Sequence, residues 1–286
     1  MTFSAAQVKE LREKTGAGMM DAKKALVENN GDMEKAMEYL RQKGIASADK
    51  KMDRIAAEGV VASYVANGIG AMVEINCETD FVAKNDEFKT LANDIAKVVA
   101  EVNPANLEEL NAAKTAAGST VEETIKEKIS TIGEKITLRR FVRYEGSIGT
   151  YIHNSKIGVL LNTTSADEVM AKDICLHIAS SAPEFVSRAE IPASVIEEET
   201  RIEMGKEDLA SKPEQIRAKI VEGRVNKLMA QRCLLEQPFV KDPNQTIEQL
   251  ISGKTEIKEF TRFVLGEGLE KRQDNFVEEV MGQIKG

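Results

Sequence analysis

The chain has 286 residues, of which 42% are hydrophobic and 30% are charged, a composition typical of a globular protein with two or more domains. The 39 basic and 47 acidic residues give a net charge of −8, which disfavours nucleic-acid binding and favours interaction with another protein. No apolar run reaches the ~18 residues of a membrane span, and the N-terminus lacks a signal-peptide pattern. We therefore expect a cytoplasmic protein that binds neither membrane nor nucleic acid.

The cysteines and histidines do not form a recognisable metal or redox motif. Cys77, Cys175 and Cys233 are far apart and give no CxxC pair, so we expect reduced thiols. His153 and His177 lack the close spacing of zinc ligands. We expect no metal and no cofactor. His177 is predicted to be a core or helix-face residue, whereas His153, at the end of a predicted strand, is either a contact residue or a plain turn residue.

The first 45 residues predict three short helices around a small core. Ser4 and Gln7 form a capping box at the start of the first helix. A TGAG stretch at 15–18 separates the first helix from the second. Asp32 is expected to cap the third helix. Such a small bundle is typical of a protein-binding module.

The third helix is expected to end at Gly44, because glycine is common just past a helix C-terminus. A charged linker is expected to follow.

An internal repeat follows the linker. EGVVASYVANGIGAMVEIN at 58–76 aligns with EGSIGTYIHNSKIGVLLNTT at 145–164, with one extra residue in the second copy. Each copy has two β-rich runs around a polar turn, which predicts a hairpin. An amphipathic helix follows each hairpin, near 86–101 and near 166–180. The repeat therefore predicts two related subdomains in which a sheet packs on a helix.

The region from Pro192 to Gln237 is strongly charged and predicts two antiparallel helices. Val195, Ile202 and Leu209 recur every seven residues, and a Lys-Pro pair then separates this run from a second amphipathic run. The apolar seam is thin, so the pair could bind a second copy of the chain or pack back on the core.

The predicted fold class is α+β. Its expected parts, in chain order, are a three-helix domain at 1–45, a linker at 46–57, a first core subdomain at 58–144, a second core subdomain at 145–188 and 235–269, an inserted helical hairpin at 189–234 and a C-terminal helical module at 270–286.

No catalytic motif stands out in the sequence. ISGKT at 251–255 resembles the end of a phosphate-binding loop, but Glu248 occupies the position of the first glycine. A carboxylate there would repel phosphate, and the stretch before it reads as helix. We therefore expect the chain not to be an enzyme.

NCETDFVAKND at 76–86 places an aromatic residue among polar ones, where a strand is expected to end. In one interpretation, Asp80 caps the following turn and Phe81 packs on an apolar neighbour. In the other, Phe81 is directed at a partner.

Several segments, in the same order along nearly the whole chain, together resemble bacterial elongation factor Ts. They are LREKTGAGMMDAKKAL at 11–26, EINCETDFVAKND at 74–86, IGEKITLRR at 132–140, IGVLL at 157–161, QPFV at 237–240 and RFVLGEGLEK at 262–271. The resemblance implies a ubiquitin-associated-like N-terminal domain, a two-part core with antiparallel sheets, a coiled-coil dimerisation hairpin and a C-terminal module. It also implies a guanine-nucleotide exchange factor for elongation factor Tu, which releases Mg²⁺ and GDP so that GTP can bind.

The resemblance further implies which residues contact the partner. Phe81 would wedge between partner side chains, and Asp80 would help to displace the segment that holds Mg²⁺. The element that enters near the nucleotide site is Thr79, Asp80, Phe81 and Val82. The implied contacts with the phosphate-side loop are Ile132, Gly133 and His153, and those with the partner's G domain are Met19, Met20 and Lys23.

Two other functions compete with this one. The chain could be a binding adaptor that acts through its N-terminal bundle, or a nucleotide-dependent enzyme that uses Gly253–Thr255. Exchange activity retained without residues 74–86 would favour the adaptor, and nucleotide binding by the isolated chain would favour the enzyme.

Overall fold

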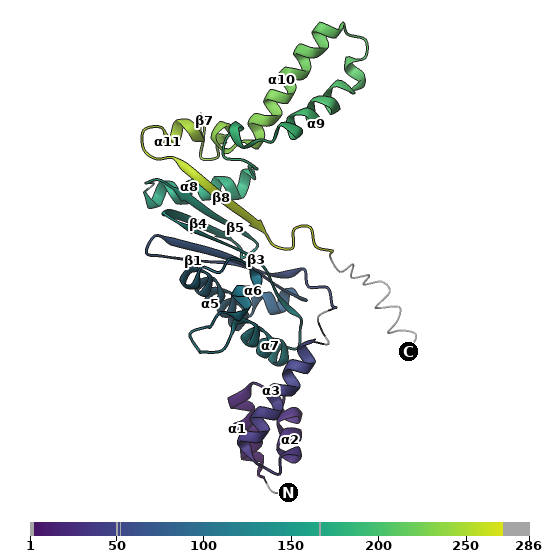
Figure 1. Cartoon of the computed structure of the whole chain (residues 1–286), viewed down its shortest axis with the longest axis vertical. Coiled ribbons are helices and arrows are strands. Elements are labelled where there is room, and N and C mark those ends of the chain that lie inside the picture. Colours follow the sequence, from purple (N-terminus) through teal and green to yellow (C-terminus); the bar gives the residue numbers. More distant parts are fainter. Residues whose placement is uncertain (1–2, 50, 52, 166, 271–286) are drawn as a thin grey trace. The chain divides into compact units, whose positions relative to one another are not determined.

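The computed structural model describes residues 3–49, 51, 53–165 and 167–270. Helices and antiparallel sheets alternate along the chain (Figure 1), in agreement with the predicted α+β class. The chain forms two compact units. The first consists of Met1–Ala62, Val73–Phe141 and Val264–Gly286, and the second of Ser63–Met72 and Val142–Phe263. Apart from residue 270, the predicted C-terminal module lies outside the described residues.

Three helices form the predicted N-terminal bundle: α1 (Ala5–Thr15), α2 (Met19–Glu28) and α3 (Met33–Asp49). The capping box of Ser4 and Gln7 is present in both directions. Gly16 ends α1 in the left-handed region, at φ 65°. Asp32 caps α3, because its Oδ1 accepts a hydrogen bond from the Lys35 backbone. Leu11 and Leu26 are fully buried in the small core of this bundle.

The prediction that Gly44 ends the third helix is wrong, since α3 continues to Asp49. A Cβ atom on Gly44 would come within 2.7 Å of Ser130 Oγ. Ser130 lies on α7 (Val121–Ile132), against which α3 packs. The missing side chain therefore permits close helix packing. Consequently, the first residues of the predicted linker are helical.

The next sheet is formed by β1 (Glu58–Ala66), β2 (Ile69–Cys77) and β3 (Ile136–Glu145), in the order β1-β2-β3. Residues 58–62, 73–77 and 136–141 of these strands belong to the first unit, and the rest belong to the second. After β2 come α4 (Asp80–Lys84), α5 (Asp86–Val102), α6 (Leu107–Ala112) and α7. The predicted amphipathic helix near 86–101 is α5, which buries an apolar stripe that includes Phe88, Leu91 and Ile95.

The second unit holds the sheet β4-β5-β8, formed by β4 (Ser147–His153), β5 (Ile157–Thr163) and β8 (Ile257–Val264). β4 and β5 are antiparallel, with Tyr151 opposite Val159. α8 (Glu168–Ser181) buries Ile174 and Ile178 in the same core as Val159. The smaller elements of this unit are β6 (Pro238–Phe239), β7 (Asp242–Thr246) and α11 (Ile247–Ile251).

The internal repeat is confirmed as two hairpins with related turns. Asn67 and Gly68 have φ values of 53° and 74°, and the matched Asn154 and Ser155 have 50° and 57°. Two successive residues with positive φ are typical of the type I′ turns that suit the twist of a hairpin. The second loop contains one further residue, Lys156.

Glu74 and its repeat counterpart Asn162 are both buried polar residues on the second strand of each hairpin. The Glu74 carboxylate accepts hydrogen bonds from the side chains of Arg139 (2.9 Å) and Arg140 (2.6 Å) and from the Gly266 backbone (2.8 Å). Burial by itself would raise the pKa of Glu74, but these partners outweigh it and lower the pKa. Glu74 therefore stays ionised, and its hydrogen bond with Gly266 attaches the segment after β8 to the sheet.

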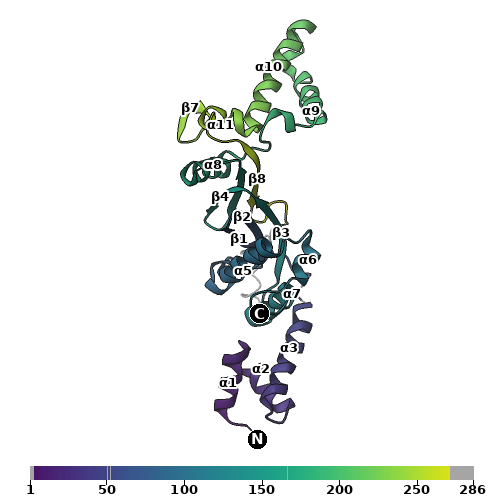
Figure 2. The same cartoon turned by 60° about the vertical axis from the view of Figure 1, so that its left-hand side comes forward.

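The helical hairpin consists of α9 (Ala193–Met204) and α10 (Glu214–Arg232), which lie side by side (Figures 1 and 2). Leu209, Val221 and Val225 lie in its buried core. Ile202, the middle member of the predicted heptad series, is 50% exposed. Ile202 therefore lies outside this core. Within the described ranges, no helix combines the length and apolar character that crossing a membrane requires.

The three cysteines are buried and form no disulfide. Burial raises the pKa of Cys77 and of Cys175 to about 12, so both are unreactive thiols. Of the two predictions for His177, a core residue or a helix-face residue, its full burial on α8 confirms the first.

Candidate functional site

Phe81 lies on α4, the short helix that follows β2, and its side chain is 82% exposed. Thr79 caps this helix, because its Oγ accepts from the Val82 backbone at 3.4 Å. Asp80 is the first helical residue and pairs with Lys84 at 2.6 Å. The interpretation in which Asp80 caps and Phe81 packs on a neighbour is therefore wrong. The buried side of α4 is occupied by Ala83 instead.

The start of α4 is tied to the loop between α7 and β3. Glu134 in this loop accepts three hydrogen bonds, from the backbone N–H groups of Glu78 (3.1 Å) and Thr79 (3.0 Å) and from the Thr79 hydroxyl (2.6 Å). Glu78 accepts one in return from the Lys135 backbone, at 2.6 Å. Sequence reasoning missed both glutamates, because their partners are 55 to 57 positions away in the chain.

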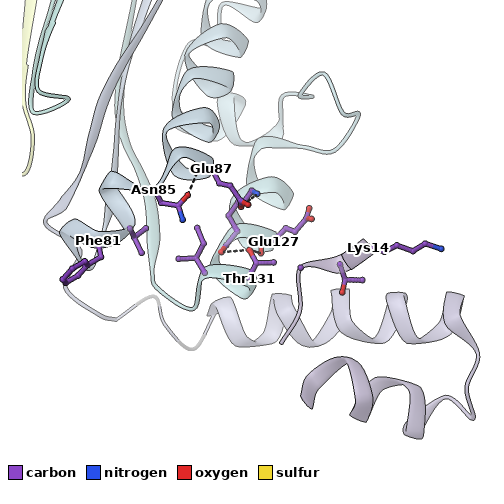
Figure 3. Close-up of a pocket in the computed structure, with 11 residues that line it drawn as sticks. Lys14, Phe81, Asn85, Glu87, Glu127 and Thr131 are labelled. Atoms are coloured by element: carbon purple, nitrogen blue, oxygen red, sulfur yellow. Dashed lines mark hydrogen bonds and ion pairs between the residues drawn. The ribbon is translucent and has the colours of Figure 1, made fainter. Parts of the chain in front are cut away.

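A hollow of about 600 Å³ lies beside Phe81 within the first unit (Figure 3). Phe81 and Val82 line it from α4, and Ile132 lines it from the end of α7. Figure 3 shows Phe81 at the far side of this region from Lys14, with its ring pointing outward. The structure thus brings together three of the residues predicted to contact a partner. The remaining lining residues are Lys14, Thr15, Gly16, Asn85, Glu87, Glu127, Lys128 and Thr131.

Gly133 directly follows Ile132 and caps α7 with φ 89°. A Cβ atom there would meet no other atom within 4 Å, so glycine is required by the backbone conformation and not by crowding. Gly133 is exposed, so the backbone at the end of α7 is accessible to a partner.

The other predicted contact residues lie on separate elements. Met19, Met20 and Lys23 are exposed on α2, with Met20 at 74%. His153 belongs to the second unit, at the end of β4, and is exposed. Its Nδ1 lies 3.1 Å from the Tyr151 hydroxyl, and its ring stacks on the tyrosine at 6.1 Å between centroids. The exposed imidazole therefore rests on a half-buried tyrosine, which itself packs against the core of the second unit.

The segment that resembles a phosphate-binding loop is occupied by internal contacts. Thr255 is buried, and its hydroxyl is hydrogen-bonded with Thr164 and with the Ser165 backbone at 3.2 Å. Lys254 donates to the Leu250 carbonyl of the preceding helix. A helix comes before this segment, as predicted, and its groups are not directed at a shared anion site.

The described residues include no cluster of three or more His, Cys, Asp or Glu side chains placed to hold a metal ion. An exposed aromatic side chain on a firmly held helical turn is instead typical of a protein that acts by binding another protein.

Comparison with known proteins identifies the family to which the chain belongs. The family model described as elongation factor TS matches residues 78–267. The chain is also 46% identical, over 292 residues that cover 100% of both sequences, to the elongation factor Ts of Alkalilimnicola ehrlichii. The chain belongs to the elongation factor Ts family.

Proposed function

We propose that the chain is a guanine-nucleotide exchange factor for elongation factor Tu and acts in the cytoplasm during protein synthesis. It binds the GDP-loaded GTPase, promotes release of Mg²⁺ and GDP, and so allows GTP to bind. Membership of the elongation factor Ts family supports elongation factor Tu as the partner. The observation that carries the mechanism is the exposure of Phe81 on α4. The chain performs no covalent chemistry of its own.

The mechanism follows from thermodynamic linkage between two ligands of one protein. An exchange factor that binds the nucleotide-free GTPase more tightly than the GDP-bound form must weaken GDP binding by the same factor. Phe81 creates this difference when it enters a pocket that opens only in the distorted, Mg²⁺-free partner. An aromatic ring supplies a large contact area with few rotatable bonds, which suits such a wedge. Asp80 assists by displacing the segment that holds Mg²⁺.

The remaining predicted residues extend the contact. Val82 and Ile132 line the same hollow as Phe81, and Gly133 directly follows Ile132. Ile132 and Gly133 contact the phosphate-side loop of the partner. His153 adds its exposed ring from the second unit. Met19, Met20 and Lys23 present apolar and cationic groups to the partner's G domain.

The test is release of a fluorescent GDP from elongation factor Tu in the presence of excess unlabelled GDP. We expect the wild-type chain to accelerate release, and Phe81→Ala to lower the stimulated rate by about 10-fold or more, as for a hot-spot residue. Because Phe81 is largely exposed, the free energy of unfolding should change by less than about 0.5 kcal/mol. Val102→Ala, a truncation of another exposed apolar residue in the first unit, should exchange at the wild-type rate.

Each alternative result has a clear meaning. Wild-type rates in Phe81→Ala would overturn the wedge but leave exchange standing. Failure of the folded wild-type chain to accelerate release would overturn the function and favour the adaptor that acts through the N-terminal bundle.

We also propose that the 189–234 hairpin joins two copies of the chain. Large apolar side chains remain exposed on both of its helices, which supports a helical partner of similar character. They are Ile196, Ile202, Met204 and Ile216.

A further inference from the structure

The helix that carries Phe81 is too short to be stable by itself. α4 has five residues, whereas isolated helices shorter than about 12 residues are marginal in water. Its only buried residue is Ala83. The position of Phe81 must therefore be set by contacts that α4 and its cap make with the rest of the first unit.

Glu134 accepts three hydrogen bonds from the residues that precede α4. Its two carboxylate oxygens accept the N–H groups of Glu78 and Thr79 and the hydroxyl proton of Thr79. Because the hydroxyl donates to Glu134, its lone pairs remain available to accept from the Val82 backbone. One carboxylate thus fixes the two residues before α4 and also orients the cap of the helix.

A second set of contacts runs in the opposite direction. Glu78 accepts from the backbone of Lys135, next to Glu134, and pairs with Arg54 at 3.2 Å. The Lys135 ammonium group donates to the Arg54 carbonyl at 2.9 Å. The strand end before α4 and the loop after α7 are therefore crosslinked by reciprocal hydrogen bonds. Ile132 ends α7 and Gly133 begins this loop, so the crosslink also holds Phe81 close to the Ile132–Gly133 pair.

We propose that Glu134 is a positioning residue for nucleotide exchange, which holds Phe81 and the Ile132–Gly133 pair in one rigid arrangement without touching the partner. This role rests on the proposed exchange function. Before Phe81 enters the partner, the affinity of the chain for the GTPase depends on contacts made by residues other than Phe81. After entry, the strain imposed on the nucleotide site depends on how firmly the ring is held. Loss of Glu134 should therefore lower the maximal rate of exchange more than the apparent affinity.

The test compares three variants of the full chain in the fluorescent GDP assay, over a range of exchange-factor concentrations. Glu134→Ala should lower the saturating rate by about 10-fold, because small misplacements of a positioned group are costly. Its half-saturating concentration should change by about 2-fold at most. Glu134→Gln should recover most of the rate, because the amide oxygen can still accept the two backbone N–H groups. Glu122→Ala removes an exposed carboxylate from α7, the helix that precedes the Glu134 loop, and should have no effect.

The decisive comparison adds Glu134→Ala to Phe81→Ala. If Glu134 acts through Phe81, the double variant should be at most about 2-fold slower than Phe81→Ala alone. A role in general stability would instead slow both backgrounds equally and lower the melting temperature, and that result would overturn the proposal. Wild-type kinetics in Glu134→Ala would also overturn it. Both results require that the wild-type chain accelerates release, so they are distinct from failure of the exchange function itself.

Discussion

The buried imidazole of His177 is held as a neutral hydrogen-bonding bridge between α8 and the segment that follows α10. Its Nδ1 accepts from the Val240 backbone at 3.2 Å, so the ring proton is on Nε2, which lies 2.8 Å from Gln237 Oε1. The Gln237 amide donates in turn to the Gln231 carbonyl. Burial lowers the pKa of His177, and the hydrogen bond to Gln237 opposes this effect only in part.

This arrangement predicts that the chain loses stability on mild acidification. Below about pH 6.5 the unfolded chain protonates His177 while the folded chain does not, so unfolding takes up a proton and the free energy of unfolding falls. The loss can reach about 1.4 kcal/mol per pH unit for one such group. Chemical unfolding at pH 7.5 and pH 5.5 should show a smaller difference in His177→Gln than in the wild type. His153→Gln, which removes an exposed histidine, should keep the wild-type difference, and equal differences in all three proteins would refute this account.

Each repeated hairpin begins with a glycine that the fold requires for two reasons. Gly59 and Gly146 have φ values of 143° and 148°, a region that other residues rarely adopt. A Cβ atom on Gly59 would come within 2.1 Å of the Ile75 carbonyl oxygen. On Gly146 it would come within 2.4 Å of the Asn162 side chain. The first neighbour is backbone within a sheet, whereas the second is a side chain.

We therefore expect Gly59→Ala to be the more destabilising of the two substitutions. Backbone strain alone should cost about 1–3 kcal/mol in either hairpin. Asn162 can rotate away from a new methyl group, although it would then lose its hydrogen bonds with Glu145 and Glu259. The carbonyl of Ile75 cannot move without disturbing β2. The urea midpoint of unfolding of each variant measures this difference. A larger fall of the midpoint in Gly146→Ala than in Gly59→Ala would contradict the explanation.

Helix ends were predictable from sequence wherever the stabilising group is a near neighbour. Ser4 with Gln7, and Asp32, act within a few residues and lie where expected. The two hairpins were predictable because the repeat shows the same turn pattern twice. Gly44 was misassigned because its neighbour Ser130 is far away in the chain, and a glycine in a packed helix looks the same in sequence as a glycine at a helix end.

The candidate site was predictable from sequence only in part. Family motifs pointed to Phe81 and Ile132, which line one hollow. Local rules alone favoured a capping role for Asp80, because aspartate is a common cap, but Thr79 takes that role. The contact with Glu134 settles the conformation at this point, and such a contact has no local signature.

For the molecule as a whole, the exposed apolar residues of the hairpin predict a change in oligomeric state. Ile202→Glu combined with Ile216→Glu places charges on both helices and should convert a dimer to monomers, as measured by sedimentation equilibrium. The proposed GDP exchange should persist, because Phe81 belongs to the other compact unit. Val169→Glu introduces a charge at an exposed position on α8, outside the hairpin, and should leave the dimer intact. A monomeric wild-type chain at micromolar concentrations would rule out this assembly.

The hydrogen bonds between Thr79 and Glu134 also affect the order in which the molecule matures. The two residues are 55 positions apart, which at ordinary rates of translation corresponds to about 3–11 s of synthesis. During that interval a growing chain already contains Phe81 but lacks the carboxylate that holds it. A polypeptide released before residue 134 would carry the aromatic side chain on an unsupported turn. Under the proposed exchange function, chains that end before the loop that precedes β3 should therefore compete poorly with complete chains for the GTPase.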